Sequence, residues 1–208
     1  MQSLPRELLF DPVLQQLCFQ PVAEQADLRL APPLLNLTSF QVPAHSNRSL
    51  GTWPGSVGNT SEVWVKFKLP LSPTTFGVGI MTDENGSPKQ VAFVDYYPSA
   101  ANVTNFTVKV GLRPPPPTLS SGTVDTLQML GSDTEIDVHV FYDNGLAEVF
   151  FMKGRVVMTQ KIAATAQAGF LIYSDGVAME VVSASAWRVG SIWIPKAQVL
   201  NGLRTGAR

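Results

Sequence analysis

Alternation of apolar and polar residues with a period of two is the feature that most constrains the fold of this chain. It is clearest from Ser61 to Leu69, where Val63, Val65, Phe67 and Leu69 alternate with Glu62, Trp64, Lys66 and Lys68. This pattern is typical of a β-strand with one face in a core. Helical periodicity is scarce, and only Val22–Leu30, which ends before Pro32 and Pro33, predicts a helix of about two turns.

Further strands are predicted along the rest of the chain, at Phe76–Thr82, Gln90–Tyr96, Phe106–Val110, Glu135–Tyr142, Leu146–Met152, Arg155–Ile162, Gly169–Tyr173 and Ala178–Val189. Their connections are short and rich in Gly, Pro, Asn and Asp. Asp143-Asn144-Gly145 predicts a tight hairpin turn, because these residues tolerate positive φ. Many short strands predict an all-β sandwich or barrel, and 208 residues suffice for one such domain.

The charge balance argues against two classes of partner. The chain has 15 Lys and Arg against 16 Asp and Glu, a formal charge of −1. No net positive field attracts nucleic acid or an anionic lipid surface. The apolar runs are also much shorter than the ~20 residues that span a bilayer. We therefore expect no nucleic-acid partner and no membrane span.

Asparagine placement predicts the compartment. Six of the eight asparagines stand in the Asn-x-Ser/Thr glycan acceptor pattern: Asn36, Asn47, Asn59, Asn85, Asn102 and Asn105. A shared preference of Asn, Ser and Thr for loops is the alternative explanation. We expect a secreted, extracellular glycoprotein. Met1–Pro5 does not resemble a signal peptide, so we expect either a longer precursor or a gene start placed too late.

The residues that usually carry chemistry are sparse. His45 and His139 are far apart and have no clustered Cys or carboxylate ligands, so we expect no metal site. Cys18, between Leu17 and Phe19, is expected to be a small buried residue. No nucleophile elbow, phosphate loop or dinucleotide fingerprint occurs, and we expect no cofactor.

Two stretches carry a family resemblance. Near the N-terminus, Leu4–Leu8, Leu17–Glu24 and Leu28-Arg29 resemble the segment that follows the catalytic propeller in glycoside hydrolase family 32, the invertases, inulinases and levanases. The matching residues there are Pro5, Arg6, Glu7, Gln20, Pro21, Val22 and Glu24. Val138–Thr159 is similar to the hallmark hairpin of the family's C-terminal sandwich, through Asp143, Glu148, Val149, Phe150, Gly154 and Thr159.

This resemblance implies a two-sheet antiparallel β-sandwich, a concanavalin-like (lectin-like or glucanase-like) jelly roll, that packs beside a five-bladed catalytic propeller. It divides the chain into a linker strand and short helix over 1–35, a sandwich over 36–195 and a tail over 196–208. The family's catalytic motifs, Asn-Asp-Pro-Asn, Arg-Asp-Pro and Glu-Cys, do not occur in the sequence. We therefore expect no catalytic residue and no hydrolase activity from this chain alone.

The predicted strands from Val138 to Phe151 are apolar on both faces, so we expect both faces to be covered, one of them by a loop or a partner. Two alternatives to an accessory module remain. A stand-alone carbohydrate-binding module would use exposed aromatic side chains to stack on sugar rings, with Trp53, Trp64, Tyr96, Tyr97 and Trp193 as candidates. The other alternative is an unrelated structural or adhesion sandwich.

Overall fold

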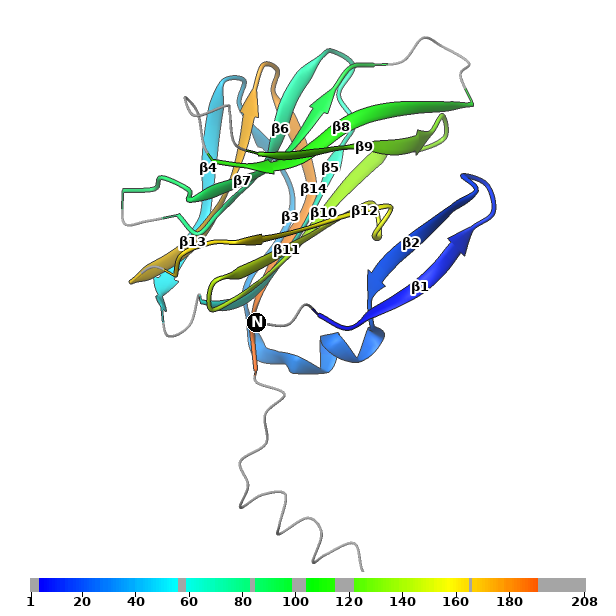
Figure 1. Ribbon diagram of the computed structural model, residues 1–208. Coiled ribbons are helices and arrows are strands. Elements are labelled where there is room, and N and C mark those ends of the chain that lie inside the picture. The colour runs from blue at the N-terminus through cyan, green and yellow to red at the C-terminus, as the bar shows by residue number, and fades with distance from the viewer. Residues whose placement is uncertain are drawn as a thin grey trace, which may run out of the picture.

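The protein is described by a computed structural model that covers residues 4–55, 59–82, 85–98, 104–114, 122–164 and 166–190. Two six-stranded antiparallel sheets pack face to face in this part of the chain (Figure 1). The predicted two-sheet antiparallel sandwich is confirmed. The expected tail lies outside the described residues, as do Trp193 and Asn102.

The first sheet has the order β12 (Val156–Lys161), β11 (Leu146–Phe151), β10 (Glu135–Asp143), β5 (Thr60–Lys68), β14 (Met179–Val189) and β3 (Arg29–Val42). The second sheet has the order β4 (Ser46–Pro54), β13 (Gln167–Asp175), β6 (Thr74–Ile80), β7 (Gln90–Tyr96), β8 (Asn105–Arg113) and β9 (Thr123–Leu130). A separate N-terminal hairpin pairs β1 (Arg6–Asp11) with β2 (Gln16–Pro21), and a 3-10 helix, η1 (Ala23–Leu28), joins it to β3.

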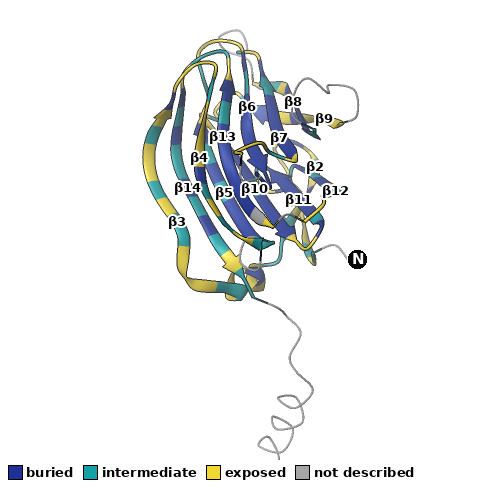
Figure 2. Ribbon diagram, turned by 90° about the vertical axis from the view of Figure 1, so that its left-hand side faces the viewer, coloured by how far each residue is buried: buried dark blue, intermediate teal, exposed yellow. Residues whose placement is uncertain are grey.

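The alternation in β5 shows how the core forms. Val63, Val65 and Phe67 have no exposed surface and point between the sheets. The Phe67 ring lies 5.0 Å from that of Phe76 on β6, so the two sheets meet through these side chains. Figure 2 shows the buried strands in the middle of both sheets, with exposed residues concentrated on β3 and β4.

Two local expectations can be compared with the structure directly. The turn after β10 has φ of 42° at Asn144 and 116° at Gly145, which confirms the tight hairpin turn. The helix expected over Val22–Leu30 is shorter and of the 3-10 type, because β3 already begins at Arg29, which pairs with Val189 of β14. Sheet pairing has replaced the last turn of the expected helix.

Truncation of Phe67 tests the contact between the sheets. We expect Phe67→Ala to lower the free energy of unfolding by about 3–5 kcal/mol, because it leaves a cavity in the middle of the core. Urea unfolding followed by tryptophan fluorescence measures this change. Lys68→Ala, on the exposed face of the same strand, is the control, with an expected loss below about 1 kcal/mol. Equal losses in the two variants would contradict the proposed core.

Candidate functional site

The outer face of the first sheet carries an unusual set of buried polar side chains. The strand register places Thr159, Glu148, Phe141, Glu62 and Trp187 in one row across the sheet, and Val157, Phe150, His139, Trp64 and Ser185 in the next. The side chains of Glu62 and Glu148 are only 1% and 2% exposed. A buried carboxylate is costly unless it is paired and hydrogen-bonded. Both carboxylates are paired, and in each case the partner comes from the N-terminal segment.

Glu148 holds the beginning of that segment. Its Oε1 accepts hydrogen bonds from Nη2 of Arg6 at 2.7 Å and from Oγ1 of Thr159 at 3.0 Å. Its Oε2 accepts the backbone N–H of Leu4 at 2.8 Å. The Arg6 guanidinium also lies 5.5 Å from the centre of the Phe150 ring. The structure thus brings together four residues of the family resemblance, Arg6, Glu148, Phe150 and Thr159.

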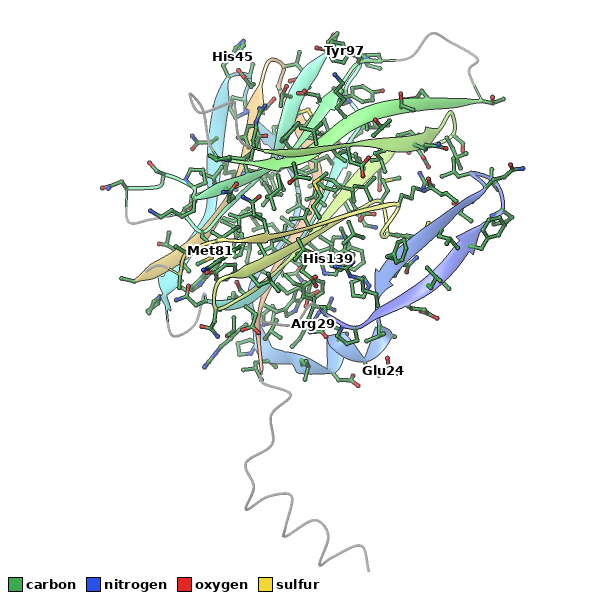
Figure 3. The ribbon with its side chains drawn as sticks, in the orientation of Figure 1. Glu24, Arg29, His45, Met81, Tyr97 and His139 are labelled. Atoms are coloured by element: carbon green, nitrogen blue, oxygen red, sulfur yellow. The ribbon has the colours of Figure 1, made fainter. Side chains whose placement is uncertain are left out.

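Glu62 holds the end of the same segment. Arg29 donates from Nε to Oε2 at 2.8 Å and from Nη2 to Oε1 at 2.5 Å, while Nε2 of His139 lies 2.6 Å from Oε1. The guanidinium of Arg29 lies 4.1 Å from the centre of the Trp187 ring. Figure 3 shows Arg29 just below His139 in the view, and both side chains contact Glu62 Oε1.

The electrostatics of Glu62 follow from these contacts. Burial by itself would raise the pKa of the Glu62 carboxyl. The hydrogen bonds from Arg29 and His139 outweigh burial and leave the pKa below its usual value of 4.5. The carboxylate is therefore ionised at neutral pH, and its charge is balanced by Arg29.

A third contact holds the hairpin between the two arginines. The backbone N–H of Phe19 donates to the carbonyl oxygen of Gly154 at 2.9 Å, in the turn between β11 and β12. Gly154 has φ of 81°, and a Cβ there would collide with the backbone oxygen of Phe19. This close approach explains why glycine occupies the position. We call the contacts at Glu148, Gly154 and Glu62 the linker clamp.

The clamped hairpin exposes an apolar face. Leu8 pairs with Phe19, and Phe10 pairs with Leu17, so these four side chains share one face of the two strands. They are 56%, 43%, 62% and 49% exposed, respectively. Val13, in the turn of the hairpin, is also exposed. We call this surface the hairpin patch.

The other face of the hairpin looks toward the sandwich. Leu9 and Cys18 line a cavity of about 360 Å³ there, together with Asp137 and Arg155. Cys18 is a free, buried thiol, as expected. Arg155 donates to Asp133 at 2.7 Å, and burial raises the pKa of the Asp137 carboxyl. The cavity thus has a mixed polar and apolar lining.

The remaining residues of the resemblance have structural positions. The carbonyl oxygen of Pro5 accepts the N–H of Val22 at 3.4 Å, which closes the base of the hairpin. Val149 is in the core, and Asp143 accepts the side-chain amide of Asn144 at 3.0 Å. Glu7, Gln20, Pro21 and Glu24 lie on the hairpin and η1 and are partly or fully exposed.

The aromatic candidates for sugar stacking do not form one surface. Trp64 stacks on His139 at 4.9 Å, on the outer face of the first sheet. Trp53 lies on β4 of the second sheet, packed against the core. Tyr96 is buried beside Phe106, and Tyr97 is 70% exposed in the loop after β7.

Among the glycan acceptor asparagines, Asn36, Asn47 and Asn85 are exposed and Asn59 is half-buried. The side chain of Asn105 lies outside the described part of the chain. Within the described ranges, no helix is long and apolar enough to cross a membrane. The same ranges contain no group of three or more His, Cys, Asp or Glu side chains that could hold a metal ion.

Sequence reasoning missed Glu62, Arg29 and Leu4 as parts of the linker clamp. The sequence feature that could have indicated Glu62 is its place on the polar side of Ser61–Leu69, the most clearly alternating strand. Its partner, Arg29, is 33 positions away in sequence. Their pairing depends on the strand order β10-β5-β14-β3, which no local sequence pattern indicates.

Comparison with known families agrees with this fold. Residues 36–188 match the family described as glycosyl hydrolases family 32 C terminal. The match covers more than half of the chain, so the chain belongs to this family. A search of curated proteins found no match.

Solved structures share the fold at low sequence identity. Fructan 1-exohydrolase IIa from Cichorium intybus is 18% identical, with a TM-score of 0.76 over 91% of this chain and 41% of that one. Exo-inulinase from Aspergillus awamori is 19% identical, with a TM-score of 0.66 over 92% of this chain and 36% of that one. The chain therefore spans less than half the length of these structures.

The ion pair at Glu62 predicts a specific pH dependence. The pKa of the Glu62 carboxyl is lower in the folded protein than in the unfolded chain. The ion pair therefore stabilises the fold above pH 4.5, and this stabilisation is lost as the pH falls through the folded-state pKa. At neutral pH, we expect Glu62→Gln to lower the free energy of unfolding by roughly 3 kcal/mol. This is the lower end of the usual cost of removing one partner of a buried ion pair. Urea midpoints measured against pH should show the difference from the unmodified protein shrinking below 4.5.

Glu180→Gln is the matched control for this experiment, because Glu180 forms an exposed ion pair with Lys68. We expect a change below about 1 kcal/mol there. A Glu62→Gln variant as stable as the Glu180→Gln variant at neutral pH would refute the clamp at Glu62.

Proposed function

We propose that this chain is the non-catalytic β-sandwich module of a secreted family 32 glycoside hydrolase that acts on sucrose or fructans. Its role is to dock on the catalytic five-bladed propeller and stabilise it. The observation that carries the proposal is the hairpin patch, an exposed apolar surface held in place by the linker clamp.

The physics of a two-stranded sheet supports docking. An isolated hairpin is marginally stable in water and needs a third strand or a covering layer on its apolar face. Here the sandwich covers only the side of Leu9 and Cys18. Two cross-strand apolar pairs remain open on the opposite side. Apolar side chains gathered in this way are typical of a surface that contacts another domain.

The chemistry of the buried carboxylates supports a non-catalytic role. Retaining hydrolysis of a glycosidic bond needs two accessible carboxyl groups about 5 Å apart. Glu62 and Glu148 are almost completely buried, and each is neutralised by an arginine. Neither carboxylate is open to a sugar. The proposal therefore assigns catalysis to the propeller.

Secretion is supported by the acceptor asparagines. Asn36, Asn47 and Asn85 are exposed, as an oligosaccharide at these positions requires. The sequence pattern and the exposure agree, and together they favour an extracellular glycoprotein.

Carbohydrate is the alternative partner, and the cavity behind the hairpin favours it. Its volume of about 360 Å³ is at the lower end of the range for small-molecule sites, about 300–1,000 Å³. Its lining offers both apolar contacts and hydrogen-bonding groups. Binding of sucrose or inulin by the chain without a propeller, measured by calorimetry, would favour this alternative.

Charge introduced into the hairpin patch tests docking. The 208-residue chain and the propeller of a family 32 enzyme are mixed, and both affinity and cleavage of sucrose and inulin are measured. We expect binding and a more stable, active complex with the unmodified chain, and no cleavage by the chain alone. Phe10→Asp combined with Leu17→Asp should weaken binding at least about 100-fold, because each substitution removes roughly 1.5–3 kcal/mol of apolar burial.

Leu71→Asp provides the control, since Leu71 is 96% exposed and lies in the loop between β5 and β6 rather than on the hairpin. It should bind as the unmodified chain does. Equal affinity of the double variant and the control would contradict docking through the hairpin patch, and fructose release by the chain alone would contradict the non-catalytic role.

A further inference from the structure

Two open sheet edges lie on the side of the sandwich opposite the hairpin. β3 is the last strand of the first sheet and β4 is the first strand of the second, so each has one side without a neighbouring strand among the described residues. The two strands follow one another in the chain and run along the same side of the molecule (Figure 2). β3 is also the longest strand described, with 14 residues.

An open edge is a liability, because its unpaired N–H and C=O groups can pair with another copy of the chain. Proteins usually protect such edges with charged residues, prolines or short strands. The other two edges follow this rule. β12 carries exposed Lys161 and β9 carries exposed Asp125.

The edge of β3 lacks this protection over most of its length. Pro32 and Pro33 interrupt only its first part. From Leu34 to Val42 the strand has no charged residue, and several of its side chains are apolar. On β4 the only charged residue is Arg48, whose guanidinium lies 4.1 Å from the centre of the Phe40 ring on β3. Arg48 therefore bridges the two edge strands.

Each of these two edge strands carries one glycan acceptor. Asn36-Leu37-Thr38 lies in the uncharged part of β3, and Asn47-Arg48-Ser49 lies on β4. Both asparagines are exposed. Oδ1 of Asn36 accepts a hydrogen bond from Ser185 Oγ at 2.9 Å, on the neighbouring strand β14. A glycan is attached to Nδ2, so this hydrogen bond remains compatible with modification.

We propose that N-linked glycans on Asn36 and Asn47 cap the open edges of β3 and β4 and prevent edge-to-edge association of the chain. The donor is a lipid-diphosphate-linked oligosaccharide. A bond forms between Nδ2 and the sugar C1, the bond from C1 to the diphosphate oxygen breaks, the lipid diphosphate leaves and Nδ2 loses one proton. A bulky, hydrated group then stands where other edges carry a charge.

The geometry is compatible with docking through the hairpin. The hairpin contacts the sandwich at Gly154, next to β12, and β12 is at the opposite end of the first sheet from β3. Glycans at the β3 edge therefore leave the hairpin patch free. The inference rests on the proposed function in one respect, the passage of the chain through the secretory pathway.

The test expresses the 208-residue chain behind a cleavable signal peptide in secretory eukaryotic cells. Glycopeptide mass spectrometry reads the occupancy of each acceptor, and size-exclusion chromatography with light scattering reads association. We expect Asn36 and Asn47 to be occupied in a monomeric protein. Asn36→Gln combined with Asn47→Gln should raise the associated fraction several-fold.

A charge-substituted variant separates edge protection from any other role of the glycans. We expect Asn36→Lys combined with Asn47→Lys to stay monomeric without glycans, because lysine protects edges in the same way. Asn85→Gln is the matched control, since Asn85 is exposed but lies between β6 and β7 rather than on an edge strand, and it should not change association. Trimming of the glycans on the folded, unmodified protein with an endoglycosidase that leaves the asparagine amide intact gives a second reading that does not depend on the folding of a variant.

Empty acceptors at Asn36 and Asn47, or a monomeric trimmed protein, would overturn the proposal. So would association of the lysine variant equal to that of the glutamine variant. Because the signal peptide is supplied, these outcomes concern the edges alone, and the propeller-binding assay tests the proposed function separately.

Discussion

The pairing of two buried carboxylates with two arginines determines how the N-terminal segment lies on this protein. Glu148 and Glu62 lie in the same row on the outer face of the first sheet, on either side of Phe141, and Arg6 and Arg29 are at the two ends of the segment that crosses it. Removal of one partner would leave an uncompensated charge in a buried place, which is far more costly than loss of an exposed ion pair. The position of the hairpin is therefore coupled to the sandwich.

This coupling explains why β10 and β11 are buried on both faces. Their inner side chains, such as Val140 and Val149, form the core between the sheets. Their outer side chains, such as Phe150 and His139, lie beneath the linker and its two arginines. The expectation that the hallmark hairpin is covered on both sides is met by one sheet on the inside and by the chain's own N-terminal segment on the outside.

The strands could be predicted where their sequence pattern continues without interruption. β5, β7, β10 and β11 combine β-branched and aromatic residues with short turns, and their ranges were predicted closely. β3, β4 and β9 were not predicted; Pro32 and Pro33 interrupt the pattern of β3, and β4 opens with the four polar residues Ser46–Ser49.

The linker clamp could be predicted only in part. The resemblance selected Arg6, Glu148, Phe150 and Thr159 without indicating that they meet. The contact of Arg29 with Glu62 depends on the strand order β5-β14-β3, which contains a crossover that no local pattern reveals. The hairpin patch was equally hidden, because an exposed Leu or Phe in a short strand looks like a core residue until the partner strands are known.

Amide hydrogen exchange across residues 6–21 tests the central claim most directly, with the isolated chain compared to the chain bound to a family 32 propeller. The account predicts slow exchange at Phe19 in both states, since its N–H is bonded to Gly154, and new protection of the β1 amides only in the complex. Fast exchange throughout the hairpin in the isolated chain would show that the clamp does not hold it. Unchanged exchange of β1 in the complex would show that the hairpin is not the docking surface.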